Sequence, residues 1–233
     1  MMKPSLATRA AAEVVGTFGF FFLGFMGIAA ATQIPGSIGS GGIAAGFGLG
    51  LGLMIFALGH VSGGHYNPAV TLGLALGRQH PWAEVPTYWL AQIVGGLAAA
   101  GVVRVLFNTQ VADALVNTPG KGVSDGLALI LELIATFLFL MVIQGVATDK
   151  KAPWNGILAP AAIGMFIFTA ATVVGPLSGG SFNPARSIAP ALVAGDYSKL
   201  WIYIVGPLLG GSIAGIAYSA FRRSEDEGAA VPS

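Results

Sequence analysis

The chain has 233 residues, of which 55% are hydrophobic and 9% are charged, and its formal net charge is +1. Soluble domains carry roughly 25% charged residues, so this composition excludes a soluble globular protein and indicates an integral membrane protein. The small net charge argues against nucleic acid as a partner, and the absence of cysteine excludes disulfides and thiol chemistry.

Six apolar stretches are long enough to cross the roughly 30 Å hydrocarbon core of a bilayer as helices. They cover residues 10–31, 41–60, 85–107, 126–147, 155–175 and 200–220. Two shorter apolar segments, 67–77 and 183–194, reach only about half of a bilayer at about 1.5 Å per residue. We therefore expect an all-α membrane protein with six transmembrane helices and two re-entrant half-helices.

The first span follows Lys3 and Arg9, as the core of a cleaved signal peptide does. Glu13 lies inside this span, and the span is longer than a signal-peptide core of about 7–15 residues, so we expect it to be retained. The distribution of Lys and Arg predicts that both termini are cytoplasmic. The short loops predict a multi-pass protein of the cell membrane, and we expect a bacterial inner membrane.

The sequence repeats itself at a spacing of 119 to about 115 residues. The matching segments are "AEVVGTFGFF" and "LELIATFLFL", "SGGHYNPAVT" and "SGGSFNPARS", and "AQIVGGLAAAG" and "VGPLLGGSIAG". We divide the single transmembrane domain, 1–233, into halves 9–107 and 125–222, a linker 108–124 and a disordered C-terminal tail 223–233. Each half holds three spans, so the second half enters the membrane from the opposite side and the half-helices face each other. Glycine spacing such as Gly211-x3-Gly215 predicts close helix packing.

Each half-helix begins with the same three residues, Asn67-Pro68-Ala69 in the first half and Asn183-Pro184-Ala185 in the second. Asparagine is a preferred N-cap and proline a preferred first helical residue. The non-helical glycines before them survive at membrane depth only when they are buried in protein or line a watery cavity. Two facing helix N-termini, each equivalent to about half a positive charge, would disfavour cations and proton-carrying water chains.

These paired motifs, with an arginine after the second motif only, resemble the aquaporin superfamily, also called major intrinsic proteins. The Glu-x-x-x-Thr-Phe opening of both halves and the order of the six spans extend the resemblance over nearly the whole chain. The resemblance implies a homotetramer in the lipid bilayer, with one pore per subunit, that passes water and small neutral solutes. It implies neither enzymatic activity nor a cofactor or metal.

The resemblance also implies a constriction formed by Phe47, Ala171, Gly180 and Arg186. Glu13 and Glu132 would accept hydrogen bonds from the backbone of the re-entrant loops. His60 and His65 flank the first loop, and we expect their nitrogens to hold the turn; a pH gate at His65 is the alternative. An arginine that merely pairs with an acid between helices is the alternative for Arg186.

The residues expected at the constriction also predict the solute. Water-selective members usually carry a histidine at the position of Ala171, so alanine there and glycine at Gly180 predict a wider opening. Bacterial glycerol facilitators normally place an aspartate after the arginine, where this chain has Ser187. The second half is most similar to the nodulin-26-like branch and its bacterial relatives, which pass glycerol, boric acid and arsenous acid.

Three other functions remain open at this point: a strictly water-selective channel, a secondary transporter and a non-conducting structural membrane protein. A transporter uses inverted repeats and broken helices too, but it normally needs coupling acids or an ion site at mid-depth. An enzyme is disfavoured because no nucleophile, base and orienting group can be assembled from the sequence.

Overall fold

The computed structural model describes residues 4–151 and 156–229, with side chains described as far as Arg222. Within these ranges every regular element is a helix, which confirms the all-α prediction. The elements are α1 (Leu6–Gln33), α2 (Ser40–Ser62), α3 (Pro68–Leu76), η1 (Trp82–Glu84), α4 (Val85–Leu106), α5 (Thr109–Ala114), α6 (Asp125–Ile143), η2 (Gln144–Thr148), α7 (Ala159–Val173), α8 (Gly175–Ser178), α9 (Pro184–Ala194) and α10 (Leu200–Ala229).

Capping residues define where several helices begin. The hydroxyl of Ser5 accepts a hydrogen bond from the backbone N–H of Thr8 at the start of α1, and Ser124 accepts one from Leu127 at the start of α6. Such caps satisfy one of the four backbone N–H groups that a helix N-terminus leaves without a partner. The first long helix of each half, α1 and α6, thus begins at a serine cap.

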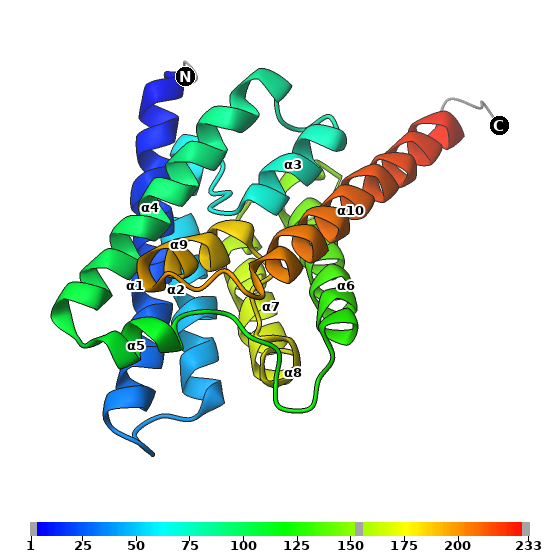
Figure 1. Ribbon diagram of the computed structural model, residues 1–233. Helices are drawn as coiled ribbons and strands as arrows, with labels where there is room; N and C mark the ends of the chain where they lie inside the picture. Colours follow the sequence, from blue (N-terminus) through cyan, green and yellow to red (C-terminus); the bar gives the residue numbers. More distant parts are fainter. Residues whose placement is uncertain (1–3, 152–155, 230–233) are drawn as a thin grey trace.

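The two half-helices are exchanged between the halves of the chain. α3 belongs to the first half but packs against α10, whereas α9 belongs to the second half and packs against α4. In the remaining bundle, α1 packs against α2 and α4, α2 against α7, and α6 against α10. The start of α1 and the end of α10 lie toward the same end of the bundle (Figure 1), as an even number of spans requires.

One of the six predicted spans is shorter than expected. Five helices in the described ranges are long and apolar enough to cross a membrane, and α7 has only 15 residues where the sequence predicted a span over 155–175. Pro160 lies in the first turn of α7, and Pro176 in the first turn of α8, so the prolines confine α7 between them. Residues 152–155 lie outside the described ranges.

Glycine allows α3 to approach α10 at backbone distance. A Cβ atom added at Gly215 would lie 2.0 Å from the carbonyl oxygen of Gly73, and one at Gly211 would lie 2.6 Å from that of Ala69. No side chain fits there, which explains the Gly211-x3-Gly215 spacing. The half-helix is therefore fixed against α10 by backbone contact.

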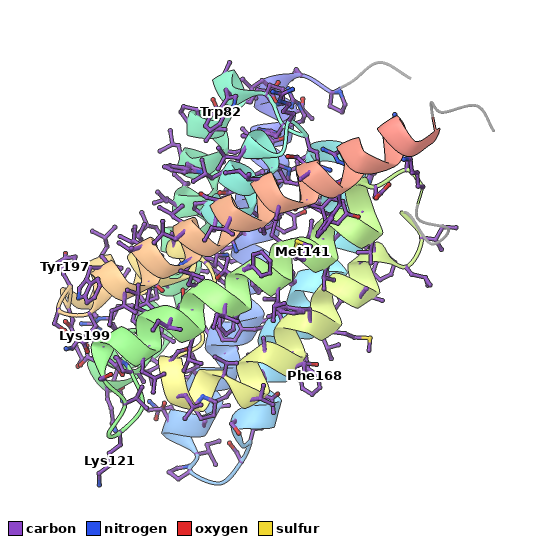
Figure 2. The ribbon with its side chains drawn as sticks, turned by 90° about the vertical axis from the view of Figure 1, so that its right-hand side faces the viewer. Trp82, Lys121, Met141, Phe168, Tyr197 and Lys199 are labelled. Atoms are coloured by element: carbon purple, nitrogen blue, oxygen red, sulfur yellow. The ribbon has the colours of Figure 1, made fainter. Side chains whose placement is uncertain are left out.

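The C-terminal segment differs from the expectation of a disordered tail from residue 223. α10 continues through this segment to Ala229, because Arg and Glu favour a helix and no glycine or proline precedes Gly228. Residues 230–233 lie outside the described ranges. Figure 2 shows α10 beside α6, with Lys121, Tyr197 and Lys199 gathered at the end of the bundle opposite the end of α10.

Candidate functional site

Two loops of nearly the same shape enter the middle of the bundle, one before each half-helix. The backbone φ angle is 98° at Gly63 and 100° at Gly179, which is the left-handed conformation that glycine adopts without strain. The match holds for non-glycine residues as well: directly before each asparagine cap, φ is 47° at Tyr66 and 53° at Phe182. The sequence repeat is thus a repeat of backbone conformation.

Each loop is held by one buried glutamate. The Glu132 carboxylate accepts hydrogen bonds from the Ser178 hydroxyl (2.7 Å) and from the backbone N–H groups of Ser181 (2.9 Å) and Phe182 (2.6 Å). Its side chain is fully buried. A buried carboxylate requires such donors, because each unsatisfied charge or polar group at this depth is costly.

The first half reproduces this arrangement around Glu13. Its carboxylate accepts hydrogen bonds from the Ser62 hydroxyl (2.7 Å) and from the backbone N–H groups of His65 (3.0 Å) and Tyr66 (2.7 Å). Gln92 donates a fourth hydrogen bond at 2.8 Å. The structure therefore brings both predicted glutamates against the loops they were expected to support.

A pair of tyrosines that the sequence analysis missed also supports the two loops. The hydroxyl of Tyr88 donates to the carbonyl of Ser62 (2.7 Å), and that of Tyr203 donates to the carbonyl of Ser178 (2.6 Å). The two tyrosines are 115 residues apart, which is the spacing of the last repeated segment. Their equivalent positions in the repeat are the feature of the sequence that could have identified them.

The N-termini of α3 and α9 meet through their asparagine caps. Asn67 accepts from the N–H of Ala69 (2.9 Å), and Asn183 accepts from that of Ala185 (3.0 Å), which fixes the orientation of each amide. The Asn67 amide nitrogen donates to the Phe182 carbonyl (2.8 Å). An amide nitrogen has two hydrogens, so one remains for a group in the space between the helices.

The partner hydrogen bond runs in the opposite direction. The Asn183 amide nitrogen donates to the carbonyl of Tyr66 at 2.9 Å. The two loops are therefore joined reciprocally, and both predicted Asn-Pro-Ala motifs lie at one place in the interior.

A lumen of two cavities adjoins this place. The larger cavity, about 680 Å³, is lined by the end of α2, the first loop and the segment around His80 and Tyr88. The smaller, about 20 Å³, is lined by Asn67, Asn183 and all four residues predicted for the constriction. A cavity needs roughly 10–15 Å³ to hold a water molecule, so the smaller one has room for about one.

Arg186 is held in the smaller cavity by aromatic rings and by the linker. Its guanidinium carbon lies 5.1 Å from the centroid of the Phe47 ring and 5.7 Å from that of Phe25, and the side chain is only 6% exposed. Its Nη1 donates to the carbonyl of Leu115 (2.8 Å) and to Oδ1 of Asn117. No ion pair of Arg186 occurs within the described ranges, so the arrangement differs from an arginine paired with an acid between helices.

Phe47 and Gly180 owe their places to their neighbours. A Cβ atom at Gly24 would lie 2.3 Å from the Phe47 ring, so glycine there gives the ring room against α1. Gly180 has a φ of 63°, and a Cβ atom there would lie 2.9 Å from the Cα of Gly175. The glycine is thus required by the backbone.

The apolar wall of the smaller cavity was not predicted. It is formed by Phe20, Leu51, Phe139 and Ile167. These residues line the same space as the two asparagines and Arg186. Phe20 and Phe139 are 119 residues apart, and Leu51 and Ile167 are 116 apart, so both pairs are equivalent in the repeat. Their symmetry could have identified them as lining residues.

The two predicted loop histidines differ in the structure. His65 is buried and lines both cavities, and its Nδ1 lies 3.1 Å from the hydroxyl of Thr71. His60 is exposed at the wall of the larger cavity, and the described residues give it no hydrogen bond to the loop. Its side chain therefore lies outside the network around Glu13.

Comparison with known proteins identifies the family of this chain. The family model described as "Major intrinsic protein" matches residues 1–218. "Probable aquaporin NIP4-2" of Arabidopsis thaliana is 42% identical over 217 residues, covering 93% of this chain and 75% of its own length. "Aquaporin NIP1-1" of Zea mays is 40% identical over 211 residues, covering 91% and 73%.

A solved structure has the same fold. The chain superimposes on the X-ray structure of the aquaglyceroporin from Plasmodium falciparum with a TM-score of 0.85, over 92% of this chain and 96% of that one. Sequence identity is 24%, so this similarity establishes the fold alone. The expectation of six spans with two re-entrant half-helices is confirmed by this match.

Proposed function

The chain belongs to the major intrinsic protein family, and from that membership we propose that it is a passive channel for water and small uncharged solutes that excludes ions and protons. Glycerol, boric acid and arsenous acid are the solutes that we propose besides water, because the sequence relatives reported above are NIP aquaporins. The family consists of channels, and we propose no enzymatic activity for this chain.

One observation supports this proposal best: the smaller cavity is polar on one side and apolar on the other. The asparagine amides and Arg186 offer hydrogen-bond donors, whereas Phe20, Phe139 and their neighbours offer only carbon. A hydroxylated solute can exchange its hydration for these donors while its C–H groups contact the apolar wall. A cation meets two helix N-termini and an arginine instead, and it loses hydration without compensation.

The volume of the smaller cavity favours a second candidate, a strictly water-selective channel. A space of about 20 Å³ holds about one water molecule, and it is smaller than a polyol. In the proposed broader function, Phe47 or Arg186 moves to admit a larger solute; in the narrower function, neither moves. The two candidates therefore differ in glycerol permeability, while both conduct water.

A stopped-flow experiment on liposomes containing the purified protein distinguishes them. After mixing with hyperosmotic glycerol, we expect fast shrinkage followed by fast, protein-dependent reswelling. Fast shrinkage without reswelling would support the water-selective candidate. Shrinkage no faster than in empty liposomes, with insertion verified, would contradict both.

A matched pair of variants ties the flux to the lumen. Ala171 lines the smaller cavity, whereas Val173 is 61% exposed two residues later, at the end of the same helix. We expect Ala171→Trp to abolish water and glycerol flux because the indole fills the cavity, and Val173→Trp to preserve both. Equal flux in the two variants would contradict conduction through this lumen.

The assembly and location follow from the same membership. We propose a homotetramer of multi-pass subunits with both termini on the cytoplasmic side, so that the larger cavity opens to the cytoplasm. The sequence relatives reported above are plant proteins, so they lend no support to the bacterial inner membrane expected from the short loops. Cross-linking of the detergent-solubilised protein tests the number of subunits.

A further inference from the structure

The linker between the halves contributes to the site although the sequence analysis assigned it no role. It contains α5, and after α5 it runs back over the second half of the chain. Asn117 in this linker is only 4% exposed, which is unusual for an amide side chain in a connecting segment. Its neighbours are residues of the second loop and of α9.

Every side-chain polar atom of Asn117 has a partner. Oδ1 accepts hydrogen bonds from Nη1 of Arg186 and from the hydroxyl of Ser187 (2.7 Å), and Nδ2 donates to the carbonyl of Gly179 (2.7 Å). Arginine has no acceptor, so the atom that faces Arg186 must be the amide oxygen. One side chain of the linker thus joins the loop, the arginine and the helix that carries it.

Among the residues that the structure describes, the first half has no equivalent of this contact. Val70 occupies the repeat position of Arg186, and the corresponding loop is held by Gln92, which contacts Glu13 and Thr71. The linker is present once in the chain, as is the arginine. The two halves therefore differ in Arg186 and in the residues that hold it.

We propose that Asn117 is a positioning residue that sets the free width of the lumen by holding the Arg186 guanidinium against the linker. This inference rests on the proposed channel function and adds a determinant of its permeability. The guanidinium carbon lies 5.7 and 5.1 Å from the centroids of the Phe25 and Phe47 rings. Such contacts attract the guanidinium but do not fix its direction, because they are not directional hydrogen bonds. Hydrogen bonds to Asn117 and Leu115 fix its direction and hold it against the wall of the smaller cavity.

Removal of the Asn117 amide changes the balance of acceptors. In Asn117→Leu the guanidinium keeps the Leu115 carbonyl but loses Oδ1, so water in the lumen becomes the alternative acceptor. The population with arginine in the lumen, relative to that at the linker, increases by roughly tenfold or more, as the loss of one hydrogen bond to a charged group implies. We expect water permeability per inserted channel to fall by up to the same factor.

A double-mutant cycle separates positioning from a general effect on folding. If Asn117 acts through Arg186, Asn117→Leu lowers water permeability in the native background and has no further effect in the Arg186→Ala background. Asn108→Leu is the matched control, because Asn108 caps α5 in the same linker and contacts Val111 rather than Arg186. We expect no coupling between Asn108→Leu and Arg186→Ala.

Four results bear on the proposal. An equal loss of permeability from Asn117→Leu in both backgrounds, or a wild-type permeability in the single variant, overturns it while leaving the channel function intact. Absence of flux in the wild-type protein overturns the channel function instead. The position of Arg186 is then decisive: a crystal structure of Asn117→Leu with the guanidinium displaced supports the positioning role, and one with it unmoved between Phe25 and Phe47 overturns it.

Discussion

Replacement of Glu132 by leucine tests whether a single carboxylate holds the second loop. The change leaves the backbone N–H groups of Ser181 and Phe182 buried without an acceptor, and it removes the partner of the Ser178 hydroxyl. Each unsatisfied buried N–H costs about 1–3 kcal/mol, so the two together cost about 2–6 kcal/mol. For a chain of this length the melting temperature should fall on the order of 10 °C.

Two measurements check this expectation in one detergent. Thermal unfolding followed by circular dichroism gives the fall in Tm, and hydrogen exchange gives the loss of protection at the Ser181 and Phe182 amides. Asp113→Leu is the control, since Asp113 is exposed on α5 and its replacement should change Tm little. An unchanged Tm with both amides still protected would refute the assigned role of Glu132.

Three further predictions concern other parts of the bundle. Phe47→Ala removes the ring beside Arg186 and should raise glycerol permeability relative to water severalfold; stopped-flow traces that give the wild-type ratio would argue against Phe47 as a limit on solute size. Gly215→Leu places a side chain where even a Cβ lies 2.0 Å from the Gly73 carbonyl, so Tm should fall by an amount that the exposed Ile216→Leu control does not show. Lys199→Ala breaks an exposed pair with Asp125 (2.7 Å) that contributes about 0–1 kcal/mol, and a Tm change as large as that of Glu132→Leu would contradict this estimate.

The sequence predicted the features that depend on local chemistry. Asn67 and Asn183 cap half-helices because asparagine before proline specifies a helix start wherever it occurs, and the structure shows both caps. The repeat predicted paired loops, and the matching contacts of Glu13 and Glu132 follow its spacing. That these residues serve conduction stays a prediction.

Features that depend on non-local packing were beyond sequence reasoning. Asn117 lies in a segment without periodicity or motif, and only the return of the linker over α9 brings it to Arg186. The predicted span over 155–175 was longer than α7, because the residues on both sides of α7 are also apolar. Pro160, in the first turn, marks where the helix begins. His60 is near His65 in sequence, but it lies two residues before the end of α2 and its side chain is exposed.

The central claim is that neutral molecules cross this lumen while charges do not. Water and proton fluxes measured in the same proteoliposomes test it most directly, with light scattering for volume and an enclosed pH-sensitive dye for protons. We predict water permeability well above that of empty liposomes, with dissipation of an imposed pH gradient no faster than theirs. Proton flux that rises in proportion to the amount of inserted protein would contradict the account.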